Sequence, residues 1–154
     1  MTVAASLVRS AEHGTIRLER MYKATPARVF AAWAEPAARA KWDVPGRWII
    51  AEQTFDFREG GCEVKRFGPV DDPRFVAETR YVDVVPERRI VYAYGMTSRG
   101  ERISISLTTV ELSPVVAGTH LILTEQVTFL DGRDNAINRE EGLSSMLDKI
   151  GLGL

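Results

Sequence analysis

The chain has 154 residues, of which 45% are hydrophobic and 27% are charged. This length and composition are typical of one globular domain and argue against a disordered protein. The 20 basic and 21 acidic residues leave a net charge of -1, which argues against a nucleic-acid-binding protein, because such proteins carry a strongly basic surface.

The cysteine count and the first residues bear on the compartment. Cys62 is the only cysteine, so an internal disulfide cannot form and a reducing compartment is expected. The N-terminus lacks the basic and long apolar stretches of a signal peptide, and no apolar run has the length of a membrane span. We therefore expect a cytoplasmic protein with no membrane span, in which residues 1–13 are a flexible lead-in and residues 14–154 form a single domain.

The first elements predicted are a strand and two short helices. Residues 15–22 alternate between apolar and polar side chains, which indicates a strand. Thr25 can cap a helix and Pro26 suits its first turn. Pro36 ends this helix and can begin a second one, which we expect to reach about Trp42.

Six further strands are expected, and short turns join most of them. Their ranges are 48–57, 62–67, 74–85, 89–96, 102–108 and 119–129. Short turns between successive strands predict a mostly antiparallel sheet. In the strand at 102–108, apolar residues alternate with polar ones, so we expect Ile103, Ile105 and Leu107 to face the interior.

The end of the chain predicts an amphipathic helix. Its apolar stripe follows helical spacing over Leu143, Met146, Leu147, Ile150 and Leu154. Such a helix must bury its stripe, and the concave sheet offers the large apolar surface that this requires. The predicted fold is therefore α+β: a seven-stranded, mostly antiparallel sheet curved around a long C-terminal helix, with two short helices between the first and second strands.

Gly142 lies inside this predicted helix. Glycine in a helix interior lowers stability by about 0.5–1 kcal/mol relative to alanine. We therefore expect Gly142 to allow a close approach of the helix to the sheet or to a ligand.

Glu125 is the most unusual residue of the last strand. It shares a strand face with Leu121, Leu123, Val127 and Phe129, and that face should point inward. A carboxylate there is costly unless it is paired or protonated. One interpretation is a ligand anchor or a general acid/base with a raised pKa; the other is a bulge that turns Glu125 to solvent.

Other candidate sites give weaker signals. Asp56 and Arg58 lie two residues apart on one strand, and we favour a surface ion pair over a polar anchor at a cavity mouth. His13 and His120 are the only histidines, and no set of residues has the spacing of metal ligands. The sequence contains no G-x-S-x-G motif. We therefore expect neither a metal nor a cofactor.

Four motifs resemble those of a known family. They are E-R-M-Y-K-A-T-P-A-R-V-F-A-A-W-A-E-P at 19–36, F-D-F-R-E-G-G at 55–61, V-V-P-E-R-R-I-V-Y at 84–92 and A-G-T-H-L-I-L-T at 117–124. In this order they are similar to the activator of heat-shock-protein-90 ATPase homologue-like family of the START / SRPBCC superfamily. The resemblance covers about residues 14–154 and implies a helix-grip fold, like that of the birch-pollen allergen. Relatives include lipid binders, polyketide cyclases, ring-hydroxylase subunits and a co-chaperone domain, so the resemblance does not fix the function.

The chain departs from the family pattern in two places. The family usually has paired aromatic residues after its second helix, where this chain has Trp42 and Asp43. The family often has Gly-Trp on its last helix, where this chain has Gly142 and Leu143. Both departures should alter the lining of the cavity.

These observations predict that the protein binds, without catalysis, a small hydrophobic or aromatic ligand between the sheet and the C-terminal helix. The first alternative is a polyketide cyclase/dehydratase-like enzyme that uses Glu125 and tyrosines; a co-chaperone contact is ranked last, and a homodimer is left open. The expected ligand-binding residues are Trp33, Trp42, Phe55, Phe57, Tyr81, Tyr92, Tyr94, Ile105, Leu107, Leu123, Glu125, Leu143, Met146 and Leu147.

Overall fold

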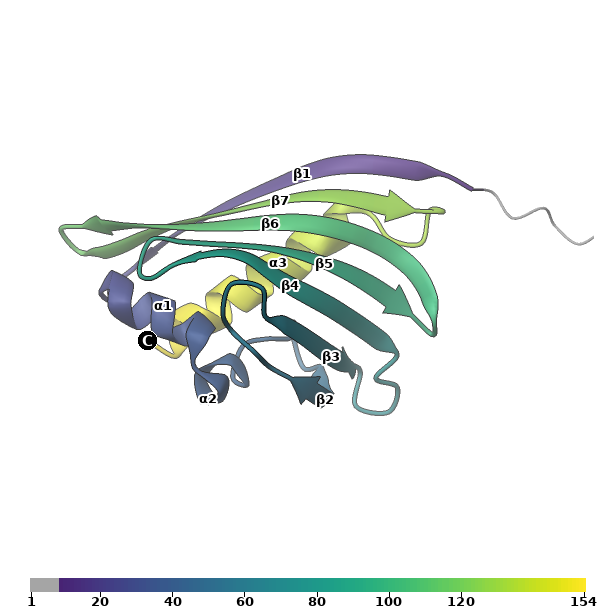
Figure 1. Ribbon diagram of the computed structural model, residues 1–154, viewed down its shortest axis with the longest axis horizontal. Helices are drawn as coiled ribbons and strands as arrows, with labels where there is room; N and C mark the ends of the chain where they lie inside the picture. The colour runs from purple at the N-terminus through teal and green to yellow at the C-terminus, as the bar shows by residue number, and fades with distance from the viewer. Residues whose placement is uncertain (1–8) are drawn as a thin grey trace, which may run out of the picture.

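A computed structural model describes residues 9–154, which form one seven-stranded antiparallel sheet and three helices (Figure 1). The strands lie in the order β1-β7-β6-β5-β4-β3-β2, so β1 and β2 form the two edges. The elements are β1 (Ala11–Tyr22), α1 (Pro26–Ala34), α2 (Pro36–Arg39), β2 (Ile49–Thr54), β3 (Cys62–Gly68), β4 (Phe75–Val85), β5 (Arg89–Ser98), β6 (Glu101–Val115), β7 (Gly118–Leu130) and α3 (Ala136–Leu152). The predicted helix-grip fold is confirmed.

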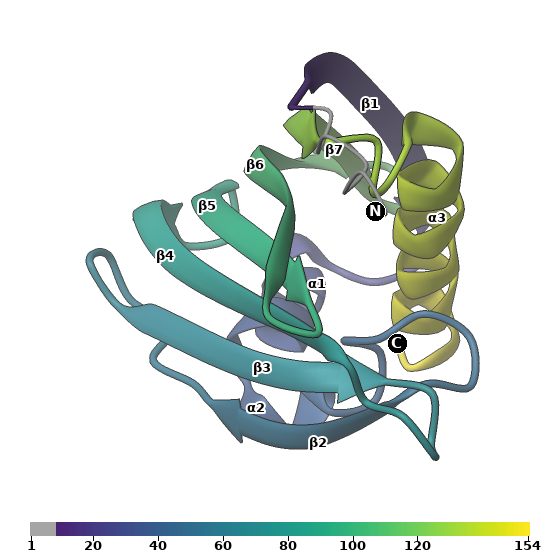
Figure 2. The same ribbon diagram turned by 90° about the vertical axis from the view of Figure 1, so that its right-hand side faces the viewer.

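The sheet curves around α3, which lies on its concave side (Figure 2). The stripe predicted for this helix is present, because Leu143, Leu147 and Ile150 are buried in the main core. Leu121 and Leu123 of β7 belong to the same core. Burial of this stripe is what holds the helix in the curve of the sheet.

Local sequence sets the ends of the helices. The Thr25 Oγ1 atom accepts a hydrogen bond from the Arg28 amide at 3.3 Å, and Pro26 occupies the first turn of α1. The Asn135 Oδ1 atom caps α3 by accepting from the Asn138 amide at 2.9 Å. α2 ends at Arg39, earlier than the expected limit near Trp42, and turns follow it.

The boundary of the domain differs from the prediction at its start. β1 begins at Ala11, so residues 11–13 pair with β7 and are not part of a lead-in. The rest of the predicted lead-in, residues 1–8, lies outside the described residues.

The orientation predicted for β6 is wrong. Ile105 and Leu107 are 54% and 41% exposed on the outer face, whereas Ser104, Ser106 and Thr108 are buried. The pairing with β5 shifts by one residue beside Ile103, so that Ile103 and Ser104 are both buried and the alternation changes phase. The inward hydroxyl groups form hydrogen bonds with buried charged residues, which are described below.

Candidate functional site

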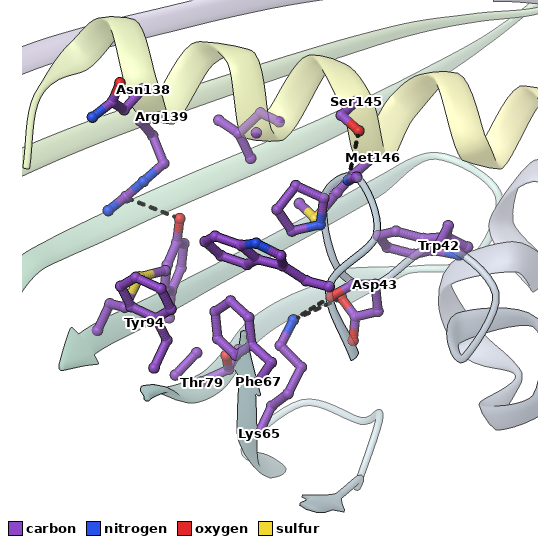
Figure 3. A pocket seen from close by; sticks show the side chains of 18 of the residues that line it. Trp42, Asp43, Lys65, Phe67, Thr79, Tyr94, Asn138, Arg139, Ser145 and Met146 are labelled. Carbon is purple, nitrogen blue, oxygen red and sulfur yellow. Dashed lines mark hydrogen bonds and ion pairs between the residues drawn. The ribbon is translucent and has the colours of Figure 1, made fainter. Parts of the chain in front are cut away.

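A cavity of about 660 Å³ lies between the concave face of the sheet, α3 and the loop that follows α2 (Figure 3). Alternation on the strands builds its wall, because residues two apart point to the same side. β4 supplies Phe75, Ala77, Thr79 and Tyr81. The wall is rich in aromatic residues, which are Trp33, Trp42, Trp48, Phe67, Phe75, Tyr81, Tyr92 and Tyr94.

The loop after α2 is fastened to α3 on one side of the cavity. The Gly46 amide donates to the Ser145 Oγ atom at 3.1 Å (Figure 3). The Lys149 ammonium donates to the carbonyl oxygens of Val44 at 2.7 Å and of Gly46 at 2.6 Å. Partial burial lowers the pKa of Lys149. These bonds hold the loop across the space between β3 and α3.

Gly142 does not have the role that we predicted. A Cβ atom added there would meet the Pro45 Cβ atom at 3.9 Å, which is ordinary van der Waals contact. The space beside α3 therefore accommodates a methyl group, and no close approach requires glycine at this position.

One end of the cavity wall contains four buried charged residues, which we call the Arg39 cluster: Arg39, Asp43, Glu63 and Lys65. The Arg39 Nη2 atom lies 2.9 Å from the Asp43 Oδ2 atom and 3.0 Å from the Glu63 Oε1 atom. The Lys65 Nζ atom lies 3.1 Å from the Asp43 Oδ1 atom. The Tyr81 hydroxyl donates to Glu63 at 2.8 Å. α2, the loop and β3 are thus joined by charges that are paired with one another.

The pairing keeps Arg39 and Asp43 ionised despite their burial. Burial alone would lower the pKa of Arg39, but Asp43, Tyr81 and Glu63 raise it above its ordinary value. Burial would raise the pKa of Asp43, but Arg39 and Lys65 lower it below its ordinary value. The cluster consists of two basic and two acidic side chains that form ion pairs with one another.

A second buried group, the Glu125 cluster, consists of Glu125, Arg139, Tyr94, Ser106 and Thr108. Glu125 is 0% exposed and receives hydrogen bonds from Arg139 Nη1 at 2.9 Å, Tyr94 at 2.7 Å, Thr108 at 2.9 Å and Ser106 at 3.2 Å. The side chain therefore points inward, and a solvent-facing bulge is ruled out. Arg139 supplies the ionic partner that a buried carboxylate needs.

The Glu125 cluster meets the cavity through Tyr94 and Arg139, which line the wall, whereas Glu125 itself does not (Figure 3). Burial would lower the pKa of Arg139, but Tyr94 and Glu125 raise it. Burial and the nearby charge of Glu125 raise the pKa of Tyr94, so its hydroxyl is neutral. Arg139 also pairs with Asp134 at 3.1 Å.

The residues that we predicted to bind a ligand fall into four places. Ile105 and Leu107 are on the outer face, and Leu123, Glu125 and Leu147 are buried behind the wall. Phe55 and Phe57 pack outside the wall, where Phe57 lies against Tyr81 with ring centroids 4.9 Å apart. The cavity brings together Trp33, Trp42, Tyr81, Tyr92, Tyr94, Leu143 and Met146.

The predicted pair of Asp56 and Arg58 is present as a surface ion pair at 3.0 Å. Both side chains are exposed, and neither lines the cavity. The structure thus bears out the surface interpretation of this pair.

Sequence reasoning missed the charged residues of the wall, although signals for them exist. Arg39 and Asp43 are four residues apart, the spacing of neighbours on one side of a helical turn. Glu63 and Lys65 share the parity of buried Phe67 on β3. Arg139 precedes Leu143 by four residues and so begins the buried stripe of α3.

Two further findings concern the described residues 9–154. No group of three or more His, Cys, Asp or Glu side chains in this range could hold a metal ion. No helix in it is long and apolar enough to cross a membrane.

Comparisons with known proteins agree with the fold. The family model described as "Activator of Hsp90 ATPase homolog 1-like protein" matches residues 23–151. An uncharacterized protein from Rhizobium leguminosarum is 41% identical, with a TM-score of 0.88 over 94% of this chain and 96% of that one. The Mll3558 protein from Rhizobium loti is 43% identical, with a TM-score of 0.87 over 94% and 99%. Protein CV1439 from Chromobacterium violaceum is 27% identical, with a TM-score of 0.79 over 90% and 94%. None of the curated proteins matches this sequence.

Proposed function

The chain belongs to the activator of Hsp90 ATPase homolog 1-like family, whose fold suggests ligand binding, and we propose that it binds a small, largely apolar aromatic ligand without catalysis. The ligand would lie in the cavity between the sheet and α3.

The observation that carries this proposal is the cavity itself. Its volume of about 660 Å³ falls within the range of about 300–1,000 Å³ that is usual for small-molecule sites. Such sites are mostly apolar and contain a few placed polar groups. Eight aromatic residues line this cavity, and Leu143 and Met146 of α3 add aliphatic surface.

The buried charges support a binding role because they are engaged with one another. Each cation of the Arg39 cluster touches a carboxylate, and Arg139 touches Glu125. A paired and hydrogen-bonded charge holds its side chain in one position. These clusters therefore act as fixed supports for the tyrosine and tryptophan rings beside them.

The same geometry disfavours the enzyme alternative built on Glu125. Both carboxylate oxygens already accept hydrogen bonds, and the residue does not line the cavity. A general acid or base must come within hydrogen-bonding distance of its substrate. We do not propose contact with a chaperone. The family description assigns activation of the Hsp90 ATPase to a homologue and not to this chain.

The same change, leucine to tryptophan, at two positions tests the proposal. Leu143→Trp, on the wall, places an indole inside the cavity, whereas Leu107→Trp places one on the exposed outer face. A panel of neutral aromatic compounds is screened by thermal unfolding. A compound at 100 times its Kd should stabilise the protein by about 2.7 kcal/mol. We expect this shift to survive Leu107→Trp and to disappear in Leu143→Trp. The proposal fails if no compound shifts the melting temperature, or if the two variants respond alike.

A further inference from the structure

Three tyrosines form a row across the cavity wall. Tyr81 is on β4, and Tyr92 and Tyr94 are on β5. The ring centroid of Tyr92 lies 5.9 Å from that of Tyr81 and 6.0 Å from that of Tyr94. Tyr92 is therefore the middle member, between the Arg39 cluster and the Glu125 cluster.

The two outer hydroxyls are already engaged. The Tyr81 hydroxyl donates to Glu63 at 2.8 Å and accepts from Arg39 at 3.2 Å. The Tyr94 hydroxyl donates to Glu125 at 2.7 Å and accepts from Arg139 at 3.1 Å. A phenol has a single proton to donate, so neither group offers a donor to a ligand.

The Tyr92 hydroxyl differs from its neighbours because it hydrogen-bonds to no residue within 9–154. Its side chain lines the cavity, and its oxygen is not among the fully buried, unpartnered atoms of that range. The oxygen thus keeps accessible surface on a residue of the cavity wall. Burial first, and then the neighbouring Tyr94 and Glu125, raise the pKa of Tyr92 well above its ordinary value, so the group is a neutral donor.

A second group beside Tyr92 also lacks an acceptor. The Trp33 ring lies 6.3 Å from the Tyr92 ring, and its Nε1 atom is the one fully buried side-chain nitrogen or oxygen without a partner in residues 9–154. Buried donors are normally paired. This part of the wall therefore lacks hydrogen-bond acceptors rather than donors.

The charge balance of the wall bears on the charge of the ligand. Arg39 and Lys65 are paired with Asp43 and Glu63, and Arg139 is paired with Glu125 and Asp134. An ionised ligand would lose its hydration without meeting an unpaired countercharge at these clusters. The part of the wall between the two clusters, where Tyr92 lies, is therefore suited to a neutral group.

We infer that the ligand is a neutral aromatic molecule with a carbonyl-type oxygen that accepts a hydrogen bond from the Tyr92 hydroxyl. This inference rests on the proposed function and adds to it the chemical class of the ligand and the residue that orients it. The aromatic rings on either side of Tyr92 give the aromatic part of the ligand its contacts, and the hydroxyl selects for the acceptor.

Two probe molecules separate the hydrogen bond from the apolar contacts. Benzophenone and diphenylmethane share two phenyl rings, but only benzophenone has a carbonyl oxygen. Their Kd values are measured by isothermal titration calorimetry with the wild type and with Tyr92→Phe. We expect Tyr92→Phe to weaken benzophenone binding about fivefold, the size of one net hydrogen bond, and to leave diphenylmethane binding unchanged.

A matched control removes a different tyrosine hydroxyl. The Tyr22 hydroxyl donates to the Leu147 carbonyl oxygen at 2.7 Å and lies outside the cavity wall. Tyr22→Phe should lower the melting temperature and leave the ratio of the two Kd values unchanged. Tyr92→Phe should leave the melting temperature unchanged, because it breaks no hydrogen bond within residues 9–154. It should change the ratio of the two Kd values.

The carbonyl stretching frequency of bound, ¹³C-labelled benzophenone gives a second readout that needs only the wild type. A hydrogen bond from Tyr92 should lower this frequency below its value in hexane. An unshifted carbonyl frequency would overturn the inference, and so would an equal effect of Tyr92→Phe on the Kd values of both probes. If both probes bind in these cases, the proposed function still stands. If neither probe binds the wild type, the inference fails, and the thermal-unfolding panel decides the proposed function separately.

Discussion

Asp43 is the residue that joins the two cations of the Arg39 cluster, because Arg39 and Lys65 both contact its carboxylate. It occupies the position at which the family usually has the second of two aromatic residues. In this chain Asp43 is an ionic support at one end of the cavity wall. Such a charge is tolerated only while both cations face it.

Asp43→Asn should therefore lower the free energy of unfolding at pH 7 by about 3–5 kcal/mol, because it leaves buried positive charge uncompensated. The pKa of Asp43 is lowered in the folded state, so its contribution is present above the ordinary value of 3.8 and is lost as pH falls through the lower folded value. Urea unfolding should thus show a difference between wild type and variant that narrows below about pH 3.8.

Asp56→Asn is the control for this measurement, because Asp56 forms an exposed ion pair with Arg58. Its unfolding curve should match the wild type at each pH. A difference for Asp43→Asn that stays constant between pH 7 and pH 3 would contradict the ionic role of Asp43.

Single residues also show where sequence reasoning reached its limit. The inward position of Glu125 could be predicted from its parity with Leu121, Leu123 and Val127. Its partner could not, because Arg139 is on α3, and the pairing depends on how the helix lies across the sheet. An arginine in the first turns of an amphipathic helix is usually on the solvent face.

Among the elements, β6 was the one that the apolar pattern misassigned. Its alternation was real, but the apolar face points outward and the hydroxyl face points to Glu125 and Arg139. A pattern of period two shows that a strand has two different faces, and it shows which face is buried only when the buried surface is apolar. Beside Glu125 the buried surface is polar, so the apolar face of β6 does not mark its buried face.

α3 offers a prediction at the scale of the element. Gly142→Ala should raise the free energy of unfolding by about 0.5–1 kcal/mol, because the methyl group fits beside Pro45 and the helix loses a flexible residue. Gly118→Ala should instead be strongly destabilising, since its Cβ atom would overlap the Tyr22 carbonyl oxygen, and the backbone has a positive φ at this position. Urea unfolding of both variants checks this contrast, and a loss of stability in Gly142→Ala would show that the space beside α3 is tighter than described.

At the scale of the molecule, the fold could be predicted because independent signals agreed. The order of four motifs, the prolines at the start of the two short helices and the apolar stripe of α3 all indicate the same architecture. Half of the predicted ligand-binding residues line the cavity, since alternation on β4 and β5 fixes which aromatic rings face inward. The ionic supports were missed because they join residues from elements that are distant in sequence, such as Arg39 and Glu63.

The measurement that tests the account most directly locates a bound ligand. Isotope-filtered NOEs are recorded between the ring protons of benzophenone and the methyl groups of the wild-type protein. The account predicts NOEs to Leu143 and Met146, which line the cavity, and none to Ile105 and Leu107, which are on the outer face. NOEs to Ile105 and Leu107 without any to Leu143 and Met146 would contradict it.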